Sequence, residues 1–252
     1  MVSKNEAKFV KSLQNRKYRE QHQLFVVEGG KNILEILNSF FQVVKLYVTQ
    51  EFFIQNYDEL SKKDIEIAIV DEKFLISNGS YLSNNAGLAL VKLKRFTIDL
   101  IDFHQNILIL DQIQDPGNLG TIIRTADWFG VNQVICSNDS VDCYNPKVVN
   151  STMGSLGRVK IMYSDLCHFF KILPHSHVLA AVLDGNPIKE TPLQKPFTLV
   201  IGSESKGIRN EVLNFCNYKV TIPRISSYAD SLNVSIACGI LLYEITSRIN
   251  WN

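Results

Sequence analysis

Apolar residues in the first hundred positions form short runs separated by segments of helical spacing. Four strands are predicted, over residues 23–29, 43–49, 66–71 and 87–94, and helices are predicted over 33–41 and 58–63. This alternation of strands and helices predicts a parallel or mixed sheet with helices packed on it. The more polar segment 94–106 follows and is the predicted boundary between two hydrophobic systems.

The second half of the chain repeats the alternation with more continuous apolar runs. Strands are predicted over residues 107–111, 133–137, 178–184, 198–203 and 219–223. Runs of this kind are typical of a parallel sheet covered on both faces. Because ligands bind beyond the carboxyl ends of such strands, the candidate binding loops are 112–120, 202–208 and 223–233.

The first of these loops leads into an amphipathic helix, in the sequence DPGNLGTIIRTA. Asn118 is predicted to cap a helix that runs to Phe129 and is closed by Gly130. Arg124 lies six residues beyond the cap, about 9 Å along the helix axis, so its side chain could reach back to a ligand at the helix start. A solvated arginine on an ordinary helix explains the same pattern equally well.

The second loop, GSESKG (202–207), places Glu204 in a polar turn between a strand and a helix predicted from Ile208. A glycine-bracketed turn suits anion or nucleotide binding. A phosphate loop is disfavoured, because Ile-Arg follows Gly207 instead of Lys-Ser or Lys-Thr.

The third loop precedes a helix over 232–245 that is apolar nearly all round. Asp230 or Ser231 is predicted to cap this helix, and Ser231 and Asn233 offer short polar groups at its start. A helix with so little polar surface requires packing on two sides. We expect the sheet on one side and a partner subunit on the other.

Composition indicates a globular protein, with 46% hydrophobic residues, 20% charged residues and a net charge of +1. Residues 1–31 carry seven basic and three acidic side chains, which suits either a phosphate backbone or a solvated helix face. Five cysteines without a CxxC pair, no signal-peptide pattern and no long apolar run predict a cytoplasmic protein without a membrane span. Cys167 and the histidines at 168, 175 and 177 match no zinc spacing, so no metal is expected.

Taken in order, DPGNLGTIIRTADWFG, LVIGSESKGI and VTIPRI…SLNVSIACGILLYE resemble the three motifs of the SpoU/TrmH family of RNA ribose 2′-O-methyltransferases, within the SPOUT superfamily. The stretch NRKYREQHQLFVVEGGKNILEIL is similar to the small RNA-binding domain that many members carry. The resemblance implies a substrate (RNA) binding α/β domain over 1–97 and a methyltransferase domain over 105–252. It also implies a parallel sheet with helices on both faces, a C-terminal trefoil knot and a homodimer formed through the knot region.

The resemblance also implies roles for individual residues. The catalytic positions of the family fall on Asn118, Arg124, Glu204, Ser231 and Asn233, and the positions that bind S-adenosyl-L-methionine fall on Gly202, Ile222 and Leu232. The chain departs from the family pattern at 224–226, where a Met and a Gly are expected, and at 84–90, where Pro-Gln-Gly is common.

The implied reaction is methyl transfer from S-adenosylmethionine to a ribose 2′-OH of structured RNA, with rRNA favoured over tRNA. Arg124 would either take the hydroxyl proton or stay cationic and stabilise the developing alkoxide. The alternative is an RNA-binding protein that keeps the fold but has lost catalysis.

Overall fold

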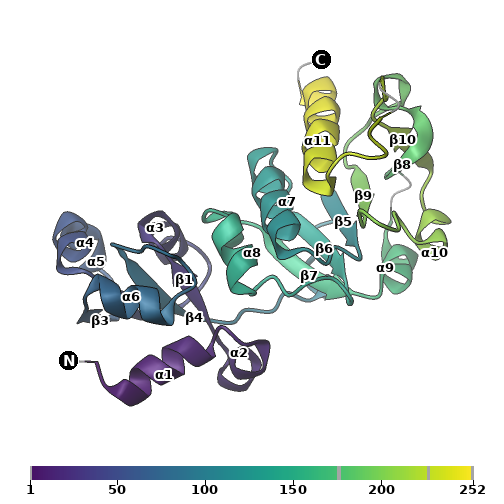
Figure 1. Ribbon diagram of the computed structural model, residues 1–252. Helices are drawn as coiled ribbons and strands as arrows, with labels where there is room; N and C mark the ends of the chain where they lie inside the picture. The colour runs from purple at the N-terminus through teal and green to yellow at the C-terminus, as the bar shows by residue number, and fades with distance from the viewer. Residues whose placement is uncertain (1, 175–176, 226–227, 251–252) are drawn as a thin grey trace. The chain divides into compact units, whose positions relative to one another are not determined.

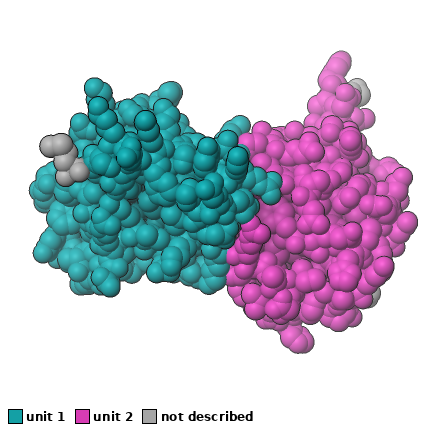
Figure 2. Space-filling view, turned by 90° about the horizontal axis from the view of Figure 1, so that it is seen from below, with its two compact units in different colours: residues 1–94, 144–158 teal, residues 95–143, 159–252 magenta. Residues whose placement is uncertain are grey.

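The computed structural model describes residues 2–174, 177–225 and 228–250 of the 252-residue chain. The chain forms two compact units (Figure 2). Unit 1 contains residues 1–94 and 144–158, and unit 2 contains residues 95–143 and 159–252. The segment 144–158 therefore lies within the second half of the sequence but packs with the first ninety residues.

Unit 1 is built on a four-stranded sheet with the strand order β1-β4-β2-β3. β2 and β3 are parallel, whereas β4 is antiparallel to both β1 and β2, so the predicted mixed sheet is confirmed. The strands are β1 (Leu24–Glu28), β2 (Val43–Val48), β3 (Glu66–Ile69) and β4 (Gly87–Lys92). The helices are α1 (Lys4–Ser12), α2 (Arg16–His22), α3 (Gly30–Leu37), α4 (Gln50–Gln55), α5 (Tyr57–Leu60), α6 (Glu72–Asn78), α8 (Pro146–Ser151) and the 3₁₀ turn η2 (Ser155–Gly157).

One hydrophobic cluster of unit 1 lies between this sheet and helices α1 and α6, and α3 also buries Ile33 and Ile36. Val10 and Leu75 pack with strand residues such as Leu88 in one buried cluster. α8 contacts β1 and buries Val148 and Val149. Burial of these two apolar side chains stabilises the packing of the 144–158 segment in unit 1.

Unit 2 is built on a six-stranded, fully parallel sheet with the order β10-β8-β9-β5-β6-β7, which confirms the predicted parallel arrangement. The strands are β5 (Ile107–Asp111), β6 (Gln133–Ser137), β7 (Lys160–Ser164), β8 (Val178–Pro187), β9 (Thr198–Gly202) and β10 (Tyr218–Thr221). The helices are α7 (Pro116–Trp128), α9 (Leu166–Ile172), α10 (Asn210–Leu213) and α11 (Val234–Asn250), with 3₁₀ turns η1 (Ile98–Leu100) and η3 (Ile188–Glu190). The pattern analysis missed β7.

Helices cover both faces of this sheet, as predicted for a SPOUT-type domain. α9 and α10 bury Phe169 and Val212 against alternate strand residues such as Ile109. The intervening residues of β5 point to the other face, and α7 and α11 lie there side by side (Figure 1). The helix predicted from Ile208 is shorter than expected, because only Asn210–Leu213 is helical. The trefoil knot stays a prediction.

Candidate active site

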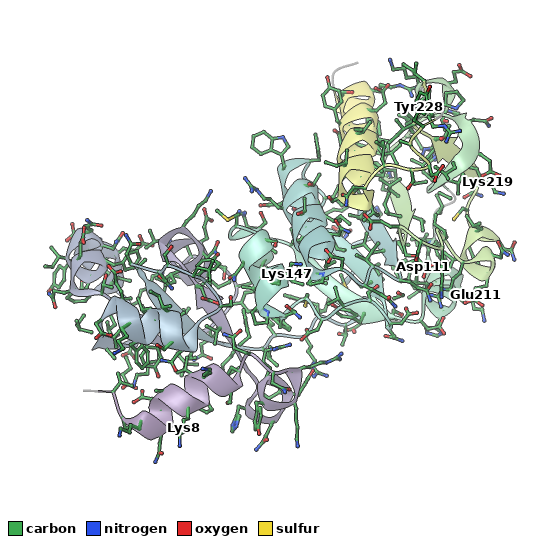
Figure 3. All side chains as sticks on the ribbon, viewed as in Figure 1. Lys8, Asp111, Lys147, Glu211, Lys219 and Tyr228 are labelled. Atoms are coloured by element: carbon green, nitrogen blue, oxygen red, sulfur yellow. The ribbon has the colours of Figure 1, made fainter. Side chains whose placement is uncertain are left out.

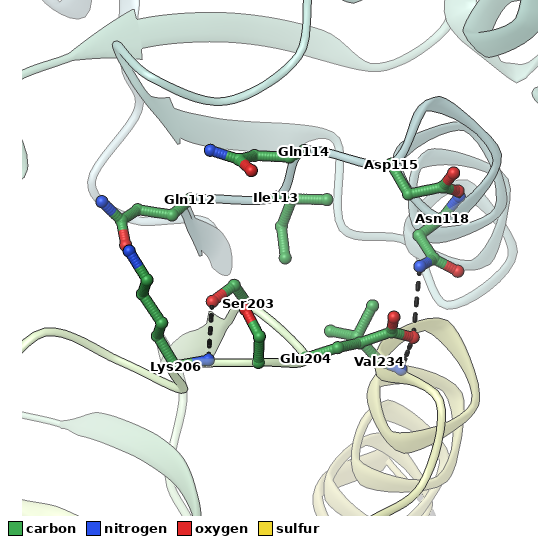
Figure 4. A pocket seen from close by; sticks show the side chains of 10 residues that line it. Gln112, Ile113, Gln114, Asp115, Asn118, Ser203, Glu204, Lys206 and Val234 are labelled. Atoms are coloured by element: carbon green, nitrogen blue, oxygen red, sulfur yellow. Dashed lines mark hydrogen bonds between the residues drawn. The ribbon is translucent and has the colours of Figure 1, made fainter.

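Three side chains from separate loops meet beyond the carboxyl end of the parallel sheet in unit 2. The Nδ2 group of Asn233 donates to Glu204 Oε1 at 2.7 Å and to Asn118 Oδ1 at 3.0 Å. The Nδ2 group of Asn118 donates to the same Glu204 oxygen at 3.2 Å (Figure 4). The structure thus brings together three of the five predicted catalytic residues, one from each predicted loop.

Glu204 is held in position by a closed turn after β9. The N–H of Ser203 donates to the carbonyl of Gly207 at 3.1 Å, and the N–H of Gly207 donates back to the carbonyl of Ser203 at 2.9 Å. A Cβ atom on Gly202 would lie 2.1 Å from the carbonyl carbon of Gly207, so the turn can close this tightly only on a glycine. Gly207 itself has φ +66°, a conformation that glycine adopts without strain.

Asn118 reaches this cluster because it is not the helix cap. The N-cap of α7 is Asp115, whose carboxylate accepts from the N–H of Asn118 at 2.8 Å, and Pro116 occupies the first helical position. The predicted cap at Asn118 is therefore wrong. Asp115 caps the helix, so the side-chain amide of Asn118 can hydrogen-bond to Glu204.

Asn233 has two functions at the start of α11. Its Oδ1 atom accepts from the N–H of Ser235 at 3.0 Å and from Ser235 Oγ at 2.6 Å, while its Nδ2 faces Glu204. The helix begins at Val234, so the cap is Asn233 and the predicted cap at Asp230 or Ser231 is wrong. Glu204 Oε1 also accepts from the N–H of Val234 at 3.2 Å. The carboxylate therefore lies at the positive end of the helix dipole, which stabilises its charge.

An ion pair between a buried Asp111 and a partly exposed Arg209 links the end of β5 to the residues after the second loop. Arg209 donates through its backbone N–H to Asp111 Oδ2 at 2.9 Å and through Nε to Oδ1 at 2.9 Å, and its Nη2 lies 2.8 Å from Oδ1. The Asp111 side chain is 0% exposed. The hydrogen bond to Asp111 raises the pKa of Arg209 above its ordinary value. Sequence analysis missed this pair, although Asp111 ends a buried strand and Arg209 directly follows the second loop.

A hollow of about 170 Å³ opens beside the Asn118–Glu204–Asn233 cluster. Two carboxylates, one ammonium group and several amides line it (Figure 4). The side chains that define its chemistry are Gln112, Gln114, Asp115, Asn118, Glu204 and Lys206. Because polar groups of both charges converge on it, the hollow suits a hydroxyl-rich or zwitterionic ligand better than an apolar one.

The other predicted site residues lie outside this hydrogen-bonded cluster. Arg124 is exposed on α7 and makes no hydrogen bond or ion pair with the described residues. Ser231 is exposed, the Leu232 side chain is 46% exposed and Ile222 is half-buried. Among the described residues, no group of three His, Cys, Asp or Glu side chains could hold a metal, and His175 lies outside them.

Comparison with known proteins identifies the family. Residues 105–243 match the model of the SpoU rRNA Methylase family, and residues 4–88 match that of the MRM3-like substrate binding domain. The chain belongs to the SpoU rRNA Methylase family. This membership confirms the predicted resemblance and the predicted enzyme class, an S-adenosylmethionine-dependent RNA methyltransferase.

Relatives of this SpoU methylase match over nearly its whole length. It is 27% identical over 241 residues to the 23S rRNA (guanosine(2553)-2′-O)-methyltransferase RlmP of Bacillus subtilis, with 93% of each chain covered. A solved TrmH-family protein from Porphyromonas gingivalis has 35% identity and a TM-score of 0.87, covering 98% of this chain and 99% of that one. The AdoMet-bound rRNA methyltransferase from Sinorhizobium meliloti has 26% identity and a TM-score of 0.87, covering 98% and 97%.

Proposed function

We propose that this protein transfers a methyl group from S-adenosylmethionine to a ribose 2′-OH of ribosomal RNA. The observation that carries the proposal is the convergence of Asn118, Glu204 and Asn233 beside one polar hollow. The 23S rRNA specificity in the name of the Bacillus subtilis relative favours rRNA over tRNA. Mapping of 2′-O-methyl marks in total RNA from a deletion strain identifies the target nucleotide. Marks lost only from tRNA would overturn the choice of rRNA.

The residues proposed for the cofactor fit an adenosine derivative. Leu232 is 46% exposed and Ile222 is half-buried, and Leu232 directly precedes Asn233 of the polar cluster, so apolar surface is available there for an adenine ring. The hollow of about 170 Å³ is smaller than the roughly 300 Å³ of the smallest common ligand sites, so it holds part of the reactants. We assign it to the ribose of the target nucleotide, whose hydroxyls match its amides and carboxylates.

In this arrangement the bound cofactor supplies an electrophilic methyl group, and the protein positions the nucleophile. The amides of Asn118 and Asn233 and the carboxylate of Glu204 form a fixed network that orients the ribose, which accounts for a large part of the rate in an in-line transfer. The O–CH₃ bond would form as the S–CH₃ bond of the cofactor breaks, with S-adenosylhomocysteine as the leaving group, and the hydroxyl proton would pass to solvent water. Arg124 would stabilise the developing alkoxide as a permanent cation, because its guanidinium does not release a proton readily. Ser231 would add a hydroxyl at the same edge.

The decisive experiment compares Arg124→Ala with Arg124→Lys. Tritium transfer from labelled adenosylmethionine to rRNA from the deletion strain should fall by about two to three orders of magnitude in the alanine variant. The lysine variant should recover part of this loss, because it keeps the charge but not the planar set of donors. Adenosylmethionine affinity, measured by calorimetry, should stay near the wild-type value in both. Full turnover in Arg124→Ala would remove Arg124 from the mechanism.

We also infer a homodimer formed through α11. Ile236, Ile240 and Tyr243 are exposed by 54%, 39% and 53%, at a spacing that places them on one side of the helix, and Trp128 on the neighbouring α7 is 84% exposed. Exposed apolar groups of this size are typical of a covered interface. Ile236→Glu should give a monomer in sedimentation velocity, whereas Glu244→Gln should not. A wild-type protein that sediments as a monomer would refute the dimer.

The proposed site of action is the cytoplasm, where an rRNA substrate and five unpaired cysteines fit a reducing compartment. In the parts of the chain that the structure describes, no helix is both long enough and apolar enough to cross a membrane.

A further inference from the structure

Unit 1 contains a second hollow, of about 630 Å³, to which no role is assigned above. Its walls come from three distant segments: the end of α1, the turn after α6, and α8. The side chains that determine its chemistry are Gln14, Ser80, Tyr81, Asn145, Lys147 and Asn150. The α8 residues lie outside the range 4–88 that matches the substrate binding domain, so the hollow is completed by the methylase half of the sequence.

The turn that forms one wall is held by a buried carboxylate. Glu28, 1% exposed at the end of β1, accepts from the N–H of Ser80 at 2.8 Å, from Ser80 Oγ at 2.5 Å and from the N–H of Tyr81 at 3.2 Å. Burying a carboxylate is unfavourable unless such donors satisfy it. These bonds hold the backbone of the turn in place, and the hydroxyl of Tyr81 accepts from Asn32 Nδ2 at 3.4 Å at the same wall.

The wall near α1 is also fixed from within. Arg19 is 3% exposed, and its Nη1 donates to the carbonyl of Gln14 at 2.9 Å and to that of Leu13 at 3.1 Å. One of the seven basic residues counted in the first 31 positions is therefore structural. It sets the position of Gln14 at the edge of the hollow.

The wall formed by α8 is linked directly to the turn. Asn150 Nδ2 donates to Ser80 Oγ at 2.9 Å. Asn150 Oδ1 is buried and has no hydrogen-bond partner among the described residues. A buried acceptor without a partner is unfavourable, and Asn150 is one of the residues that line the hollow. Lys147 is exposed on the same helix (Figure 3).

The described lining combines one ammonium group, side-chain amides and hydroxyls, and it includes no carboxylate. Burial, together with the charge of Glu28, raises the pKa of Tyr81, so its hydroxyl remains a donor at neutral pH. Amides offer paired donors and acceptors that match the edges of a nucleobase, and an aromatic ring offers a stacking surface. An ammonium group suits a phosphate.

We propose that this hollow binds one unpaired nucleotide of the substrate RNA, with Lys147 at the phosphate and Asn150 and Gln14 at the base. The proposal rests on the proposed function, because it takes RNA as the substrate. A volume of about 630 Å³ lies within the roughly 300–1,000 Å³ range of sites that enclose a small ligand, so a whole nucleotide can enter. An unpaired nucleotide is favoured over a duplex because only its base edges and faces are free for such contacts.

The first test measures binding of full-length protein to rRNA from the deletion strain. Lys147→Glu should raise the Kd at least tenfold and raise KM for RNA with kcat nearly unchanged, since the contact is equal in ground and transition states. The matched control is Lys62→Glu, an exposed lysine of unit 1 that does not line the hollow. Asn150→Asp should act in the same direction, with Asn85→Asp as its control. Thermal unfolding checks that all four variants are folded.

The second test maps contacts by photo-crosslinking of the same rRNA, substituted with 4-thiouridine, followed by mass spectrometry. Crosslinked peptides containing Tyr81 or residues 145–151 support the proposal. Crosslinks confined to other segments of unit 1, or equal effects of Lys147→Glu and Lys62→Glu on Kd, overturn it. The nucleotide-site proposal and the proposed function are tested by different results. If the wild type transfers no methyl group to rRNA, the proposed function fails, but the effect of Lys147→Glu on RNA binding can still be measured.

Discussion

Replacement of Glu204 by Gln isolates the charge of the carboxylate from its shape. Glu204 Oε1 accepts three hydrogen bonds, from Asn233 Nδ2, Asn118 Nδ2 and the N–H of Val234. The oxygen of a glutamine amide can accept the same three bonds, so the geometry should survive. What is lost is the charge, both in these bonds and at the start of α11.

The expected size of the effect of Glu204→Gln depends on how exposed the carboxylate is. A hydrogen bond to a charged group contributes about 1.5–3 kcal/mol and a neutral one about 0.5–1.5 kcal/mol, so three bonds to one oxygen set an upper limit of several kcal/mol. Glu204 is exposed and its three bonds share one acceptor, and a charge at an exposed helix start contributes only about 0.3–1 kcal/mol. We therefore expect Glu204→Gln to weaken the interactions that hold the Asn118–Glu204–Asn233 cluster by about 1–2 kcal/mol. Glu204→Ala should weaken them more, because the three donors lose their acceptor.

The assay is methyl transfer to rRNA at saturating adenosylmethionine. A loss of about 1–2 kcal/mol in transition-state positioning corresponds to a decrease in kcat/KM of about 5- to 30-fold for Glu204→Gln. Urea unfolding reports any loss of global stability separately, and Glu190→Gln, an exposed carboxylate elsewhere in unit 2, is the control. The reasoning is refuted if Glu204→Gln has wild-type kcat/KM, or if Glu204→Ala is no worse than Glu204→Gln.

Two further predictions concern ion pairs that hold each unit together. Asp111→Asn should lower the free energy of unfolding by about 1.5–3 kcal/mol in urea, because the fully buried Asp111 loses its charge and with it the charge-assisted hydrogen bonds from Arg209, whereas the exposed Asp99→Asn should leave it unchanged. In unit 1, hydrogen bonding to Lys45 lowers the pKa of Glu6 below its ordinary 4.5. The stabilisation from Glu6 is therefore complete above pH 4.5 and is lost as pH falls through the lower folded pKa. The stability difference between wild type and Glu6→Gln, measured by urea unfolding across pH 3–7, should shrink in acid; a difference that grows in acid would contradict this sign.

The parallel sheet could be predicted from the sequence because a strand buried on both faces requires an uninterrupted apolar run. β5 and β9 both have such runs, and their carboxyl ends define the loops that carry Asn118 and Glu204. β7, with the residues KIMYS, was missed although its pattern is similar to that of β6, QVICS, which was predicted; short runs of three apolar residues between polar ends do not separate strands from other segments. The caps of α7 and α11 were misplaced because several adjacent residues can each cap a helix, and only tertiary contacts decide between them.

The placement of 144–158 in unit 1 could not be predicted from local patterns. The sequence around Val148 and Val149 predicts that the two valines are buried, but not against which sheet. The hydrophobic effect is non-directional, so burial is equally favourable against any apolar surface. The contact of α8 with β1 joins segments that are far apart in the sequence, so local patterns do not specify it. The same limit applies to the ion pair of Asp111 with Arg209, which joins residues 98 positions apart.

The two units of the chain carry net charges of opposite sign. Unit 1 carries fifteen Lys and Arg against eleven Asp and Glu, a net +4, and unit 2 carries eleven against fourteen, a net −3. We therefore expect attraction of a polyanion to come mainly from unit 1, because the net charge of unit 2 is negative. Under the proposed mechanism, Arg124 would be the cation of unit 2 that lies near a phosphate next to the reacting ribose. If this division holds, added salt should raise KM for RNA steeply and leave kcat almost unchanged, because screening weakens capture by unit 1 and hardly alters short contacts at the reacting ribose.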